Sequence, residues 1–434
     1  MDLKDKKITV IGLGNSGFNA AMLAADLGAK VWVTDAGDSP AIREAKEKLE
    51  AKGVKVEIGR HTEEYIKGSD LVVLSPGVEK TSPALKWAGA HKITVIGEME
   101  LGYRFCKGRI IAITGTNGKS TVTSLTGRML KDGGFDTVVC GNIGNSLCGE
   151  IGRIKKDTWV VLEVSSFQLE TTADFKPHIA VILNITDDHM DRYSGFEDYF
   201  AEKLKIFRNQ DKDDHLVLNH DAGNLRGLEK LTKSRTSFYR KSPADEFDTN
   251  LKGIHNTENI LASILVSSIV GVKRESVLRA IKDFKGLPHR FETVAVIEGV
   301  EYIDDSKGTT VDSTARALDS CDKPVILIAG GKDKHSDYGA VKFKIRAKVK
   351  DLILIGEAKG AIAAAFKGAC AVHNAEDMDE AVRLARRLAK KGDSVLLSPM
   401  CSSFDMYRSY KHRGEVFRKA VDGIRCEAQE AQYS

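Results

Sequence analysis

The sequence predicts an α/β protein of three units, each built on a parallel sheet with covering helices. Short apolar runs alternate with amphipathic helical stretches along the chain, which is the pattern of such sheets. The 434 residues exceed the size at which one hydrophobic core keeps growing, so two or three domains are expected. The strand pattern is interrupted near residues 97 and 287, which predicts domains at 1–97, 98–287 and 288–434.

The composition is that of an ordinary globular protein. Hydrophobic residues make up 42% and charged residues 29%, and the net charge of +4 is too slight to favour a nucleic-acid-binding surface. The seven cysteines show no C-x-x-C spacing, which favours a reducing cytoplasm over a zinc or redox site. A strand pattern begins near residue 8 and no apolar run reaches transmembrane length, so we expect neither a signal peptide nor a membrane span.

The first unit carries a glycine-rich turn between its first strand and its first helix. Residues 12–17 read Gly-Leu-Gly-Asn-Ser-Gly, and Asp35 follows about 20 residues later, which is the fingerprint of a dinucleotide-binding, Rossmann-like domain. Taken alone, this pattern favours an NAD(P)-binding dehydrogenase or sensor. The same helix N-terminus would hold any pyrophosphate, including that of a UDP-sugar. The strands of this unit are predicted at 8–11, 30–34, 71–74 and 93–96.

A second phosphate-binding loop opens the central unit. The apolar run 110–113 leads into Thr-Gly-Thr-Asn-Gly-Lys-Ser-Thr at 114–121 and then into a helical pattern, the order that a phosphate-cradling loop requires. Its glycines let backbone N–H groups converge on phosphate oxygens. Lys119 would reach the outer phosphates, and Ser120 or Thr121 would ligate Mg²⁺. The spacing departs from G-x-x-x-x-G-K-[ST], because Ile113 stands where the first Gly belongs.

The remaining strand ends of the central unit also carry polar residues. Ligands of open α/β sheets collect at the carboxyl ends of strands, so these ends should converge on the phosphate loop. Glu163 emerges on a buried strand, where an unpaired carboxylate is costly, and this favours a Mg²⁺ ligand over a stray acid. Acids cluster with His189 at 184–192. The strands are predicted at 137–140, 158–164, 179–185 and 215–219.

The last part of the chain predicts a third α/β unit, again Rossmann-like. A helix with strong apolar periodicity is expected over 260–270, with Asn256 as its N-cap. Gly and Pro mark a seam at 286–292. Beyond the seam, strands are predicted at 291–297, 301–304, 325–329, 352–355 and 394–397.

The amino-acid sequence of residues 114–121 resembles the ATP loop of the Mur ligase family. These are ATP-dependent amide-forming enzymes of peptidoglycan precursor synthesis. The resemblance covers nearly the whole chain and implies a central P-loop ATPase-like domain. It implies ATP contacts by Gly115, Thr116, Asn117, Gly118, Lys119, Ser120, Thr121, Asn256, Asn259, His289, Arg290, Asp305 and Lys307.

In that family the N-terminal domain takes the uridine nucleotide of the substrate. The resemblance therefore implies a UDP-substrate site rather than a dinucleotide site. The implied contacts are Leu13, Asn15, Ser16, Asp35, Ser75, Gly77 and Asn142. For the turn at 75–77 and for Asn142, a plain β-turn is the alternative that the residues alone leave open.

The resemblance also implies two Mg²⁺ sites and three catalytic residues. The metal ligands would be Ser120, Glu163, His189 and Lys203, the last as a carbamate, and the catalytic residues would be Lys119, His189 and Lys203. Lys203 lies in an amphipathic helical stretch, where the pattern alone indicates a solvated lysine.

The final motifs resemble the D-glutamate-adding branch of the family. Residues 330–337 and 398–407 carry this likeness, and the Asp-Asn-Pro-Arg stretch expected of the diaminopimelate- or lysine-adding branch is absent. The implied D-glutamate contacts are Thr309, Lys334, Ser403 and Tyr410, with a charged loop residue as the alternative for Lys334.

The resemblance thus implies an ATP-dependent ligase that joins D-glutamate to UDP-N-acetylmuramoyl-L-alanine through an acyl phosphate. Such an enzyme would be a cytoplasmic monomer that needs ATP and Mg²⁺ and binds small-molecule substrates rather than nucleic acid. A folylpolyglutamate-synthase-like ligase is the nearest alternative, and an NAD(P)-binding protein is the alternative from a different class.

Overall fold

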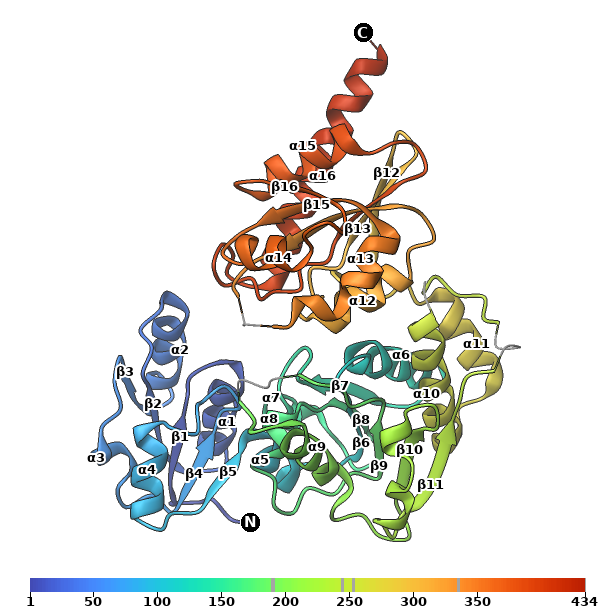
Figure 1. Cartoon of the computed structure of the whole chain (residues 1–434). Coiled ribbons are helices and arrows are strands. Elements are labelled where there is room, and N and C mark those ends of the chain that lie inside the picture. Colours follow the sequence, from blue (N-terminus) through green and yellow to red (C-terminus); the bar gives the residue numbers. More distant parts are fainter. Residues whose placement is uncertain (189–191, 243–245, 252–253, 334–335, 434) are drawn as a thin grey trace. The chain divides into compact units, whose positions relative to one another are not determined.

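The computed structural model (Figure 1) describes residues 1–188, 192–242, 246–251, 254–333 and 336–433. It contains three sheets, and the α/β class with mainly parallel strands is confirmed. In the described part of the chain, no helix combines the length and the apolar character needed to cross a membrane.

The first sheet has the strand order β3-β2-β1-β4-β5, and all its strands are parallel. Val10 of β1 faces a core shared with α1, whereas its neighbour Ile11 faces a core shared with α3 and α4. Both faces are therefore covered, which explains why the strands are continuous apolar runs. The elements are β1 (Lys7–Ile11), α1 (Asn15–Asp26), β2 (Lys30–Asp35), α2 (Pro40–Glu50), β3 (Lys55–Ile58), α3 (Glu63–Ile66), β4 (Leu71–Leu74), α4 (Pro83–Ala90) and β5 (Val95–Gly97).

The second sheet is also parallel, with the order β11-β10-β9-β6-β8-β7. Its central strand β6 feeds the phosphate loop directly into α6. The elements are α5 (Glu98–Phe105), β6 (Arg109–Thr114), α6 (Lys119–Asp132), β7 (Thr137–Gly141), α7 (Leu147–Glu150), β8 (Trp159–Glu163), α8 (Ser166–Leu169), β9 (Ile179–Ile182), α9 (Phe196–Leu204), β10 (His215–Asn219), β11 (Arg235–Tyr239), α10 (Ile254–Val270) and α11 (Arg274–Asp283).

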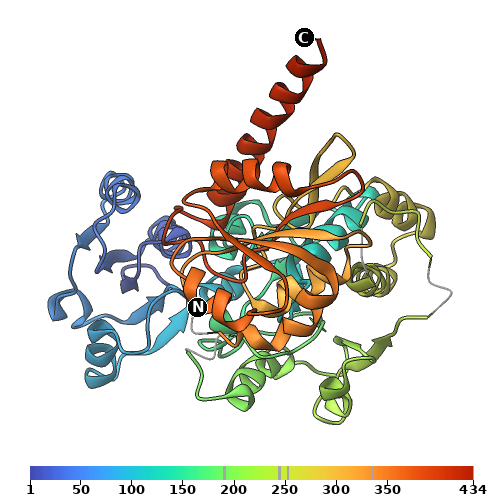
Figure 2. The ribbon, with the colours of Figure 1, turned by 45° about the horizontal axis from the view of Figure 1, so that its top comes forward.

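The third sheet has the order β12-β13-β17-β14-β15-β16, in which β12 is antiparallel to β13 and the other pairs are parallel. Leu318, Ile345 and Ile362 cover one face, and Val382 and Phe417 cover the other. The last helix, α16, extends beyond the sheet it packs against (Figure 2). The elements are β12 (Glu292–Ile297), β13 (Val300–Asp304), α12 (Val311–Asp319), β14 (Val325–Gly330), α13 (Lys342–Lys348), β15 (Val349–Ile355), α14 (Lys359–Ala365), β16 (Ala371–Asn374), α15 (Met378–Leu388), β17 (Ser394–Leu397) and α16 (Tyr410–Tyr433).

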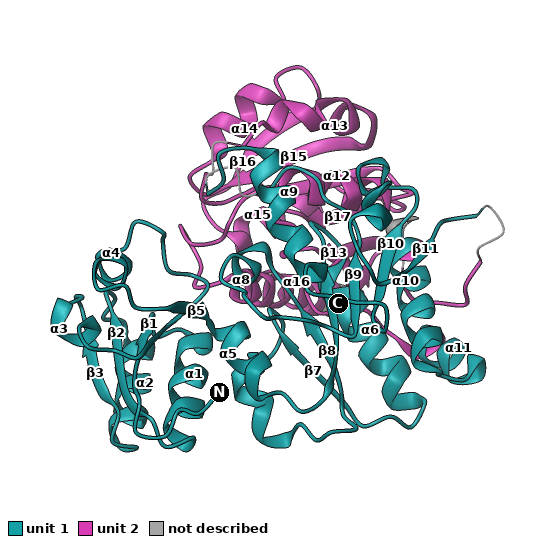
Figure 3. Ribbon diagram, turned by 90° about the horizontal axis from the view of Figure 1, so that it is seen from below, with its two compact units in different colours: residues 1–245, 258–281 teal, residues 246–257, 282–434 magenta. Residues whose placement is uncertain are grey.

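The chain divides into two compact units (Figure 3). Unit 1 comprises residues 1–245 and 258–281 and holds the first two sheets. Unit 2 comprises residues 246–257 and 282–434 and holds the third sheet. Both glycine-rich turns of the sequence therefore belong to unit 1.

Several predicted elements differ from the structure. The strand predicted at 179–185 ends at Ile182, because Leu183 and Asn184 bond to the phosphate loop instead of continuing the ladder. The strand predicted at 93–96 begins only at Val95. Asn256 was predicted to cap a helix, but α10 begins at Ile254, so Asn256 lies inside its first turn and the capping prediction is wrong.

Candidate functional site

The phosphate loop of unit 1 leaves β6 and enters α6 through Gly118. This residue has φ +85°, in the left-handed region that favours glycine. A Cβ at Gly118 would lie only 2.4 Å from Asn259 Oδ1, so the loop and the first part of α10 approach closely here. Asn259, one of the predicted ATP contacts, is therefore placed beside the loop.

The loop is fastened to the segment that follows β9. The Asn117 backbone N–H donates to Asn184 Oδ1 at 2.9 Å, and Asn184 Nδ2 donates back to the Asn117 carbonyl at 3.1 Å. Thr116 Oγ1 donates to the Thr186 carbonyl and accepts from the Thr186 N–H, both at 3.0 Å. These reciprocal hydrogen bonds fix the conformation of the loop where it meets the segment after β9. Asn184 and Thr186 were not predicted as site residues, although their place at a strand end was a usable signal.

Lys119 folds back over its own loop. Its Nζ donates to the carbonyls of Gly115 at 2.8 Å and Thr116 at 2.9 Å. Ser120 and Thr121, the predicted Mg²⁺ ligand and its neighbour, are buried in the first turn of α6. The predicted ATP residues 115–121 thus form one continuous structure at the carboxyl end of β6.

Lys203 is buried, in contrast to what its helical pattern alone indicates. Its side chain is 1% exposed, and Nζ lies 3.0 Å from the Gly115 carbonyl, to which it donates, and 3.4 Å from Thr114 Oγ1. Nζ also lies 4.7 Å from the centre of the Tyr199 ring. Burial, assisted by the positive charge of Lys119, lowers the pKa of Lys203 well below its usual value. Tyr199 was missed in the sequence, although it stands one helical turn before Lys203.

Glu163 ends β8, the strand that pairs with β6 in the sheet. Its carboxylate is 2% exposed. Oε1 accepts a hydrogen bond from Asn142 Nδ2 at 3.0 Å, while Oε2 is buried and has no hydrogen-bond partner among the residues that the structure describes. A bare buried carboxylate oxygen is costly unless a cation meets it, so this geometry fits a Mg²⁺ ligand. Asn142 is placed against Glu163 and does not line the cavity of the first sheet.

The metal ligand set cannot be completed from the described residues. His189 and Lys334, predicted in the metal and D-glutamate sites, lie outside the residues that the structure describes. In the described part of the chain, no group of three or more His, Cys, Asp or Glu side chains is arranged to hold a metal ion. Of the predicted ligands, the structure describes Ser120, Glu163 and Lys203.

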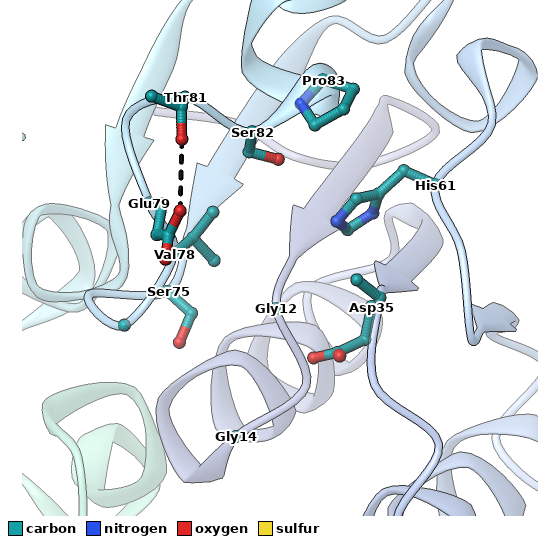
Figure 4. A pocket seen from close by; sticks show the side chains of 12 residues that line it. Gly12, Gly14, Asp35, His61, Ser75, Val78, Glu79, Thr81, Ser82 and Pro83 are labelled. Atoms are coloured by element: carbon teal, nitrogen blue, oxygen red, sulfur yellow. Dashed lines mark hydrogen bonds between the residues drawn. The ribbon is translucent and has the colours of Figure 1, made fainter.

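A cavity of about 500 Å³ opens at the carboxyl ends of β1, β2 and β4 in the first sheet (Figure 4). This is the position where the strand order reverses, between β1 and β4, and where open α/β sheets bind ligands. Three of the predicted UDP-substrate contacts, Asp35, Ser75 and Gly77, line this cavity, and so does His61, which was not among the predicted contacts. The cavity is lined by Gly12, Gly14, Asp35, Ala36, His61, Ser75, Gly77, Val78, Glu79, Thr81, Ser82 and Pro83.

Asp35 joins the glycine-rich turn to the segment that follows β2. Oδ2 accepts from the Leu13 N–H at 2.5 Å and Oδ1 accepts from the Gly37 N–H at 2.6 Å. The predicted contacts Asn15 and Ser16 begin α1 next to this turn but are not among the residues that line the cavity. A Cβ at Gly17 would lie 1.8 Å from the Gly12 carbonyl oxygen, so the third glycine of the fingerprint is needed for close packing of α1 on the turn.

In unit 2, the residues before β12 and after β13 form a polar cluster. His289 has φ +63°, and its Nδ1 lies 2.7 Å from Asp304 Oδ2 in a hydrogen bond. Asp305 is buried and accepts from Ser398 Oγ at 2.8 Å. Burial raises the pKa of Asp305 to about 7, although Ser398 and the nearby charge of Arg290 favour its ionised form. The predicted residues His289, Arg290 and Asp305 are therefore together within this unit.

Lys307 and Tyr410 also meet in unit 2. Lys307 Nζ lies 4.0 Å from the centre of the Tyr410 ring, a cation–π contact. Thr309 follows on the same loop, where its N–H donates to the Lys307 carbonyl at 2.8 Å. Ser403 is buried in the segment after β17. Thr309 and Ser403 thus lie on segments that follow two strands of the third sheet. Tyr410 is the first residue of α16.

Comparison with known proteins gives the same family for all three parts of the chain. Residues 6–97 match the MurD-like N-terminal domain of Mur ligases, residues 113–246 the Mur ligase middle domain, and residues 289–401 the Mur ligase glutamate ligase domain.

Similar proteins align over nearly the full length. The UDP-N-acetylmuramoylalanine–D-glutamate ligase of Koribacter versatilis is 43% identical over 445 residues, covering 97% of this chain and 98% of the relative. That of Geotalea daltonii is 43% identical over 447 residues, covering 98% and 99%. The crystal structure of UDP-N-acetylmuramate-alanine ligase from Thermotoga maritima shares the fold, with a TM-score of 0.64 at 19% identity over 96% of this chain and 99% of that chain.

Proposed function

Because the chain belongs to the Mur ligase family, we propose that it catalyses the ATP-dependent addition of D-glutamate to UDP-N-acetylmuramoyl-L-alanine, a step of peptidoglycan precursor synthesis. Relatives that carry this activity in their names align with it from end to end, at 40–43% identity in the case of Koribacter, Geotalea and Pelotomaculum. The folylpolyglutamate-type and NAD(P)-binding alternatives have no comparable support.

One observation carries the chemical part of this function. A phosphate loop, a buried carboxylate with a bare oxygen and a buried lysine converge at the carboxyl edge of the second sheet. A dinucleotide-binding protein has no need of the latter two groups. A ligase that moves a phosphoryl group needs Mg²⁺ ligands at that place, which Glu163 and, as a carbamate, Lys203 would supply.

We assign ATP to the phosphate loop. Its backbone N–H groups and the α6 N-terminus would hold the phosphates, and Lys119 would exchange its carbonyl partners for phosphate oxygens. Residues 115–121 and Asn259 belong to unit 1. The further ATP contacts that we propose, Asn256, His289, Arg290, Asp305 and Lys307, belong to unit 2.

Mg²⁺ would be held by Glu163 and Ser120, with His189 and carbamoylated Lys203 as further proposed ligands at two sites. When bound, Mg²⁺ neutralises charge that develops on the transferring phosphoryl group. Glu163 Oε2 suits this role because it is buried and accepts no hydrogen bond from the described residues, so its lone pairs can bind a cation. Lys203 needs a neutral amine to react with CO₂, and its burial beside Lys119 favours that neutral form.

The UDP part of the substrate is assigned to the cavity of the first sheet. Asp35, Ser75 and Gly77 line this cavity. Leu13, Asn15 and Ser16 lie in the turn and at the start of α1, whose N-terminus would favour an anion such as the diphosphate. Asn142 stands apart, against Glu163, which suits a contact with the acceptor end of the substrate near the phosphoryl transfer.

D-glutamate is assigned to unit 2, with Thr309, Lys334, Ser403 and Tyr410 as its proposed contacts. ATP phosphorylates the terminal carboxylate of the alanyl substrate to an acyl phosphate. The amine of D-glutamate then attacks the acyl carbon, and phosphate leaves from the tetrahedral intermediate. Lys119 stabilises the charge on the transferring phosphoryl group.

We further propose three domains with boundaries at 97/98 and 287/288, a cytoplasmic location and a monomeric state. The boundaries are supported by the ends of the sheets, since β5 ends at Gly97 and β12 begins at Glu292. Sedimentation of the purified protein tests the monomeric state, and limited proteolysis tests the boundaries.

The activity is tested by phosphate release from ATP in the presence of UDP-N-acetylmuramoyl-L-alanine while the amino acid is varied. We expect release that depends on D-glutamate and not on L-glutamate, lysine or diaminopimelate. Release that depends on a folate acceptor with L-glutamate would favour the folylpolyglutamate-type alternative. Tight binding of NAD(P) without any ATP turnover would favour the dinucleotide-binding alternative.

A further inference from the structure

Arg413, in the first turn of α16, is a completely buried cation at the carboxyl edge of the third sheet. It is 0% exposed and is the bulkiest of the fully buried side chains in the described residues. No ion pair joins it to a carboxylate in the described part of the chain. A charged side chain is rarely buried in this way unless it meets groups that need it.

The guanidinium of Arg413 bonds to three segments that leave neighbouring strands. After β13, Ser306 accepts at Oγ from Nε (3.0 Å) and at its carbonyl from Nη2 (2.9 Å). After β17, the Cys401 carbonyl accepts from Nη1 and Nη2, both at 3.2 Å, and the Ser402 carbonyl from Nη1 at 3.3 Å. At the end of β14, the Gly330 carbonyl accepts from Nη1 at 3.5 Å.

These three segments are also joined directly to one another. The Lys332 N–H donates to the Ser402 carbonyl at 3.0 Å, and the Met400 N–H donates to the Gly308 carbonyl at 3.0 Å. A Cβ at Gly331 would lie 2.3 Å from the Ser402 carbonyl oxygen and 3.1 Å from Arg413 Nη1, so glycine is required for this approach. Arg413 therefore stands at the centre of a tightly joined junction.

Two of these segments carry proposed D-glutamate contacts that the structure describes. Thr309 follows Ser306 after β13, and Ser403 directly follows Ser402 after β17. The planar guanidinium has five donors in a fixed fork and can hold several carbonyls at set angles, which an ammonium group cannot do. Its geometry thus fixes the spacing between the segments on which amino-acid recognition depends.

We infer that Arg413 is a positioning residue that sets the D-glutamate site by locking the segments after β13, β14 and β17 together. This inference rests on the proposed function, because it names the amino-acid end of that same reaction. Arg413 touches no substrate itself and acts through Ser306, Gly330, Cys401 and Ser402. Burial lowers the pKa of its guanidinium to about 10, which leaves it charged at neutral pH.

The test compares Arg413→Lys with Arg418→Lys in the full-length enzyme. Arg418 lies on the same helix, ion-pairs with Glu292 at 2.8 Å, and has a side chain that is 41% exposed. Its replacement by lysine is the matched control, because it also removes a guanidinium group from α16 but not one that joins the three segments. We expect Arg413→Lys to raise the KM for D-glutamate about tenfold or more, because several fixed hydrogen bonds are lost, while the KM values for ATP and the UDP substrate change by less than about threefold. Arg418→Lys should leave all three unchanged.

A second variant protects the test against simple misfolding. Ser306→Ala removes one acceptor of Arg413 and the donor to the Tyr410 carbonyl, and it should shift the KM for D-glutamate in the same direction by a smaller factor, with a thermal midpoint lowered by roughly a few degrees. Equal increases in the KM values for ATP and D-glutamate, or a lower thermal midpoint with unchanged KM values, would overturn the positioning role. Absence of D-glutamate-dependent turnover in the wild-type enzyme would instead overturn the proposed function.

Discussion

The two glycine-rich turns of unit 1 use the same backbone device for different purposes. Both lead from a central strand into a helix, and in both the helix N-terminus is a place where an anion can bind. In the turn after β1, the nearby carboxylate of Asp35 is satisfied by two backbone N–H groups. Beside the turn after β6, the nearby carboxylate of Glu163 keeps one oxygen bare, and two lysines contact the loop.

This difference is what we expect between a site that only binds an anion and a site that transfers a phosphoryl group. A satisfied carboxylate shapes a loop and needs no further partner, whereas a bare buried carboxylate oxygen is unfavourable until a cation meets it. The first turn suits a diphosphate that is bound and left unchanged. The second suits a phosphate that is transferred.

The largest effect should come from Lys119→Ala. We expect turnover to fall by about a thousandfold, because the charge that stabilises the transferring phosphoryl group is removed from a preorganised site. Binding of the UDP substrate, measured by calorimetry, should stay nearly intact, since its cavity lies on the other sheet. Lys131→Ala, at the exposed end of the same helix, should match the wild type. Loss of UDP-substrate binding in a folded Lys119→Ala protein would contradict the separation of the two sites.

Lys203→Ala should lower turnover by about a hundredfold, because the carbamate that would ligate Mg²⁺ cannot form. Lys205→Ala is the matched control, since Lys205 directly follows α9 and ion-pairs with Glu202 at 2.6 Å, and we expect this variant to be active. ¹³C NMR after labelling with ¹³CO₂ should detect a carbamate in the wild type and none in Lys203→Ala. An unmodified amine in active, Mg²⁺-loaded enzyme would refute this role.

Glu163→Gln should raise the Mg²⁺ concentration needed for half-maximal activity by about 10- to 100-fold. Without Mg²⁺ the same change should leave the thermal midpoint unchanged or raise it, because a buried charge with a bare oxygen has been removed. Glu197→Gln, an exposed acid in the first turn of α9, provides the control for loss of one charge. A large fall in midpoint with an unchanged Mg²⁺ requirement would make Glu163 structural.

The smallest effect is expected for Asp35→Asn, beside the turn after β1, which we assign to substrate binding alone. One of the two backbone N–H groups of Leu13 and Gly37 would lose its acceptor, so the KM for the UDP substrate should rise about five- to tenfold while kcat stays the same. Asp38→Asn, at an exposed acid paired with Arg43, should change neither value. A fall in kcat at saturating UDP substrate would show that the two turns are not functionally separate.

The sequence predicted the central strands well and missed three of the six edge strands of the described sheets. The predicted strands 71–74, 215–219 and 394–397 coincide with β4, β10 and β17, which are buried and therefore strongly apolar. The missed strands, β3, β11 and β16, each lie at the edge of a sheet. An edge strand is partly exposed and needs no continuous apolar run, so periodicity does not reveal it.

The candidate site was predictable where a motif is local and hidden where it depends on tertiary contacts. The phosphate loop and Glu163 were visible from residue types and spacing. The burial of Lys203 was not, because the alternation of its helix is that of a surface helix and only the fold places that face against Thr114 and Gly115. Arg413 was missed for the same reason, since its carbonyl partners have no sequence signature.

The position of Lys119 bears on how the loop selects its anion. The ammonium group already donates to the carbonyls of Gly115 and Thr116, so an anion that takes these donors must replace two hydrogen bonds. A free phosphate or chloride ion that touches the loop at one place recovers little in this exchange. A nucleoside triphosphate can bond to the backbone N–H groups and to the ammonium group at the same time, so we expect its total gain to exceed the loss. We therefore expect the folded-back lysine to compete with incoming anions and to favour polyphosphates over simple salts.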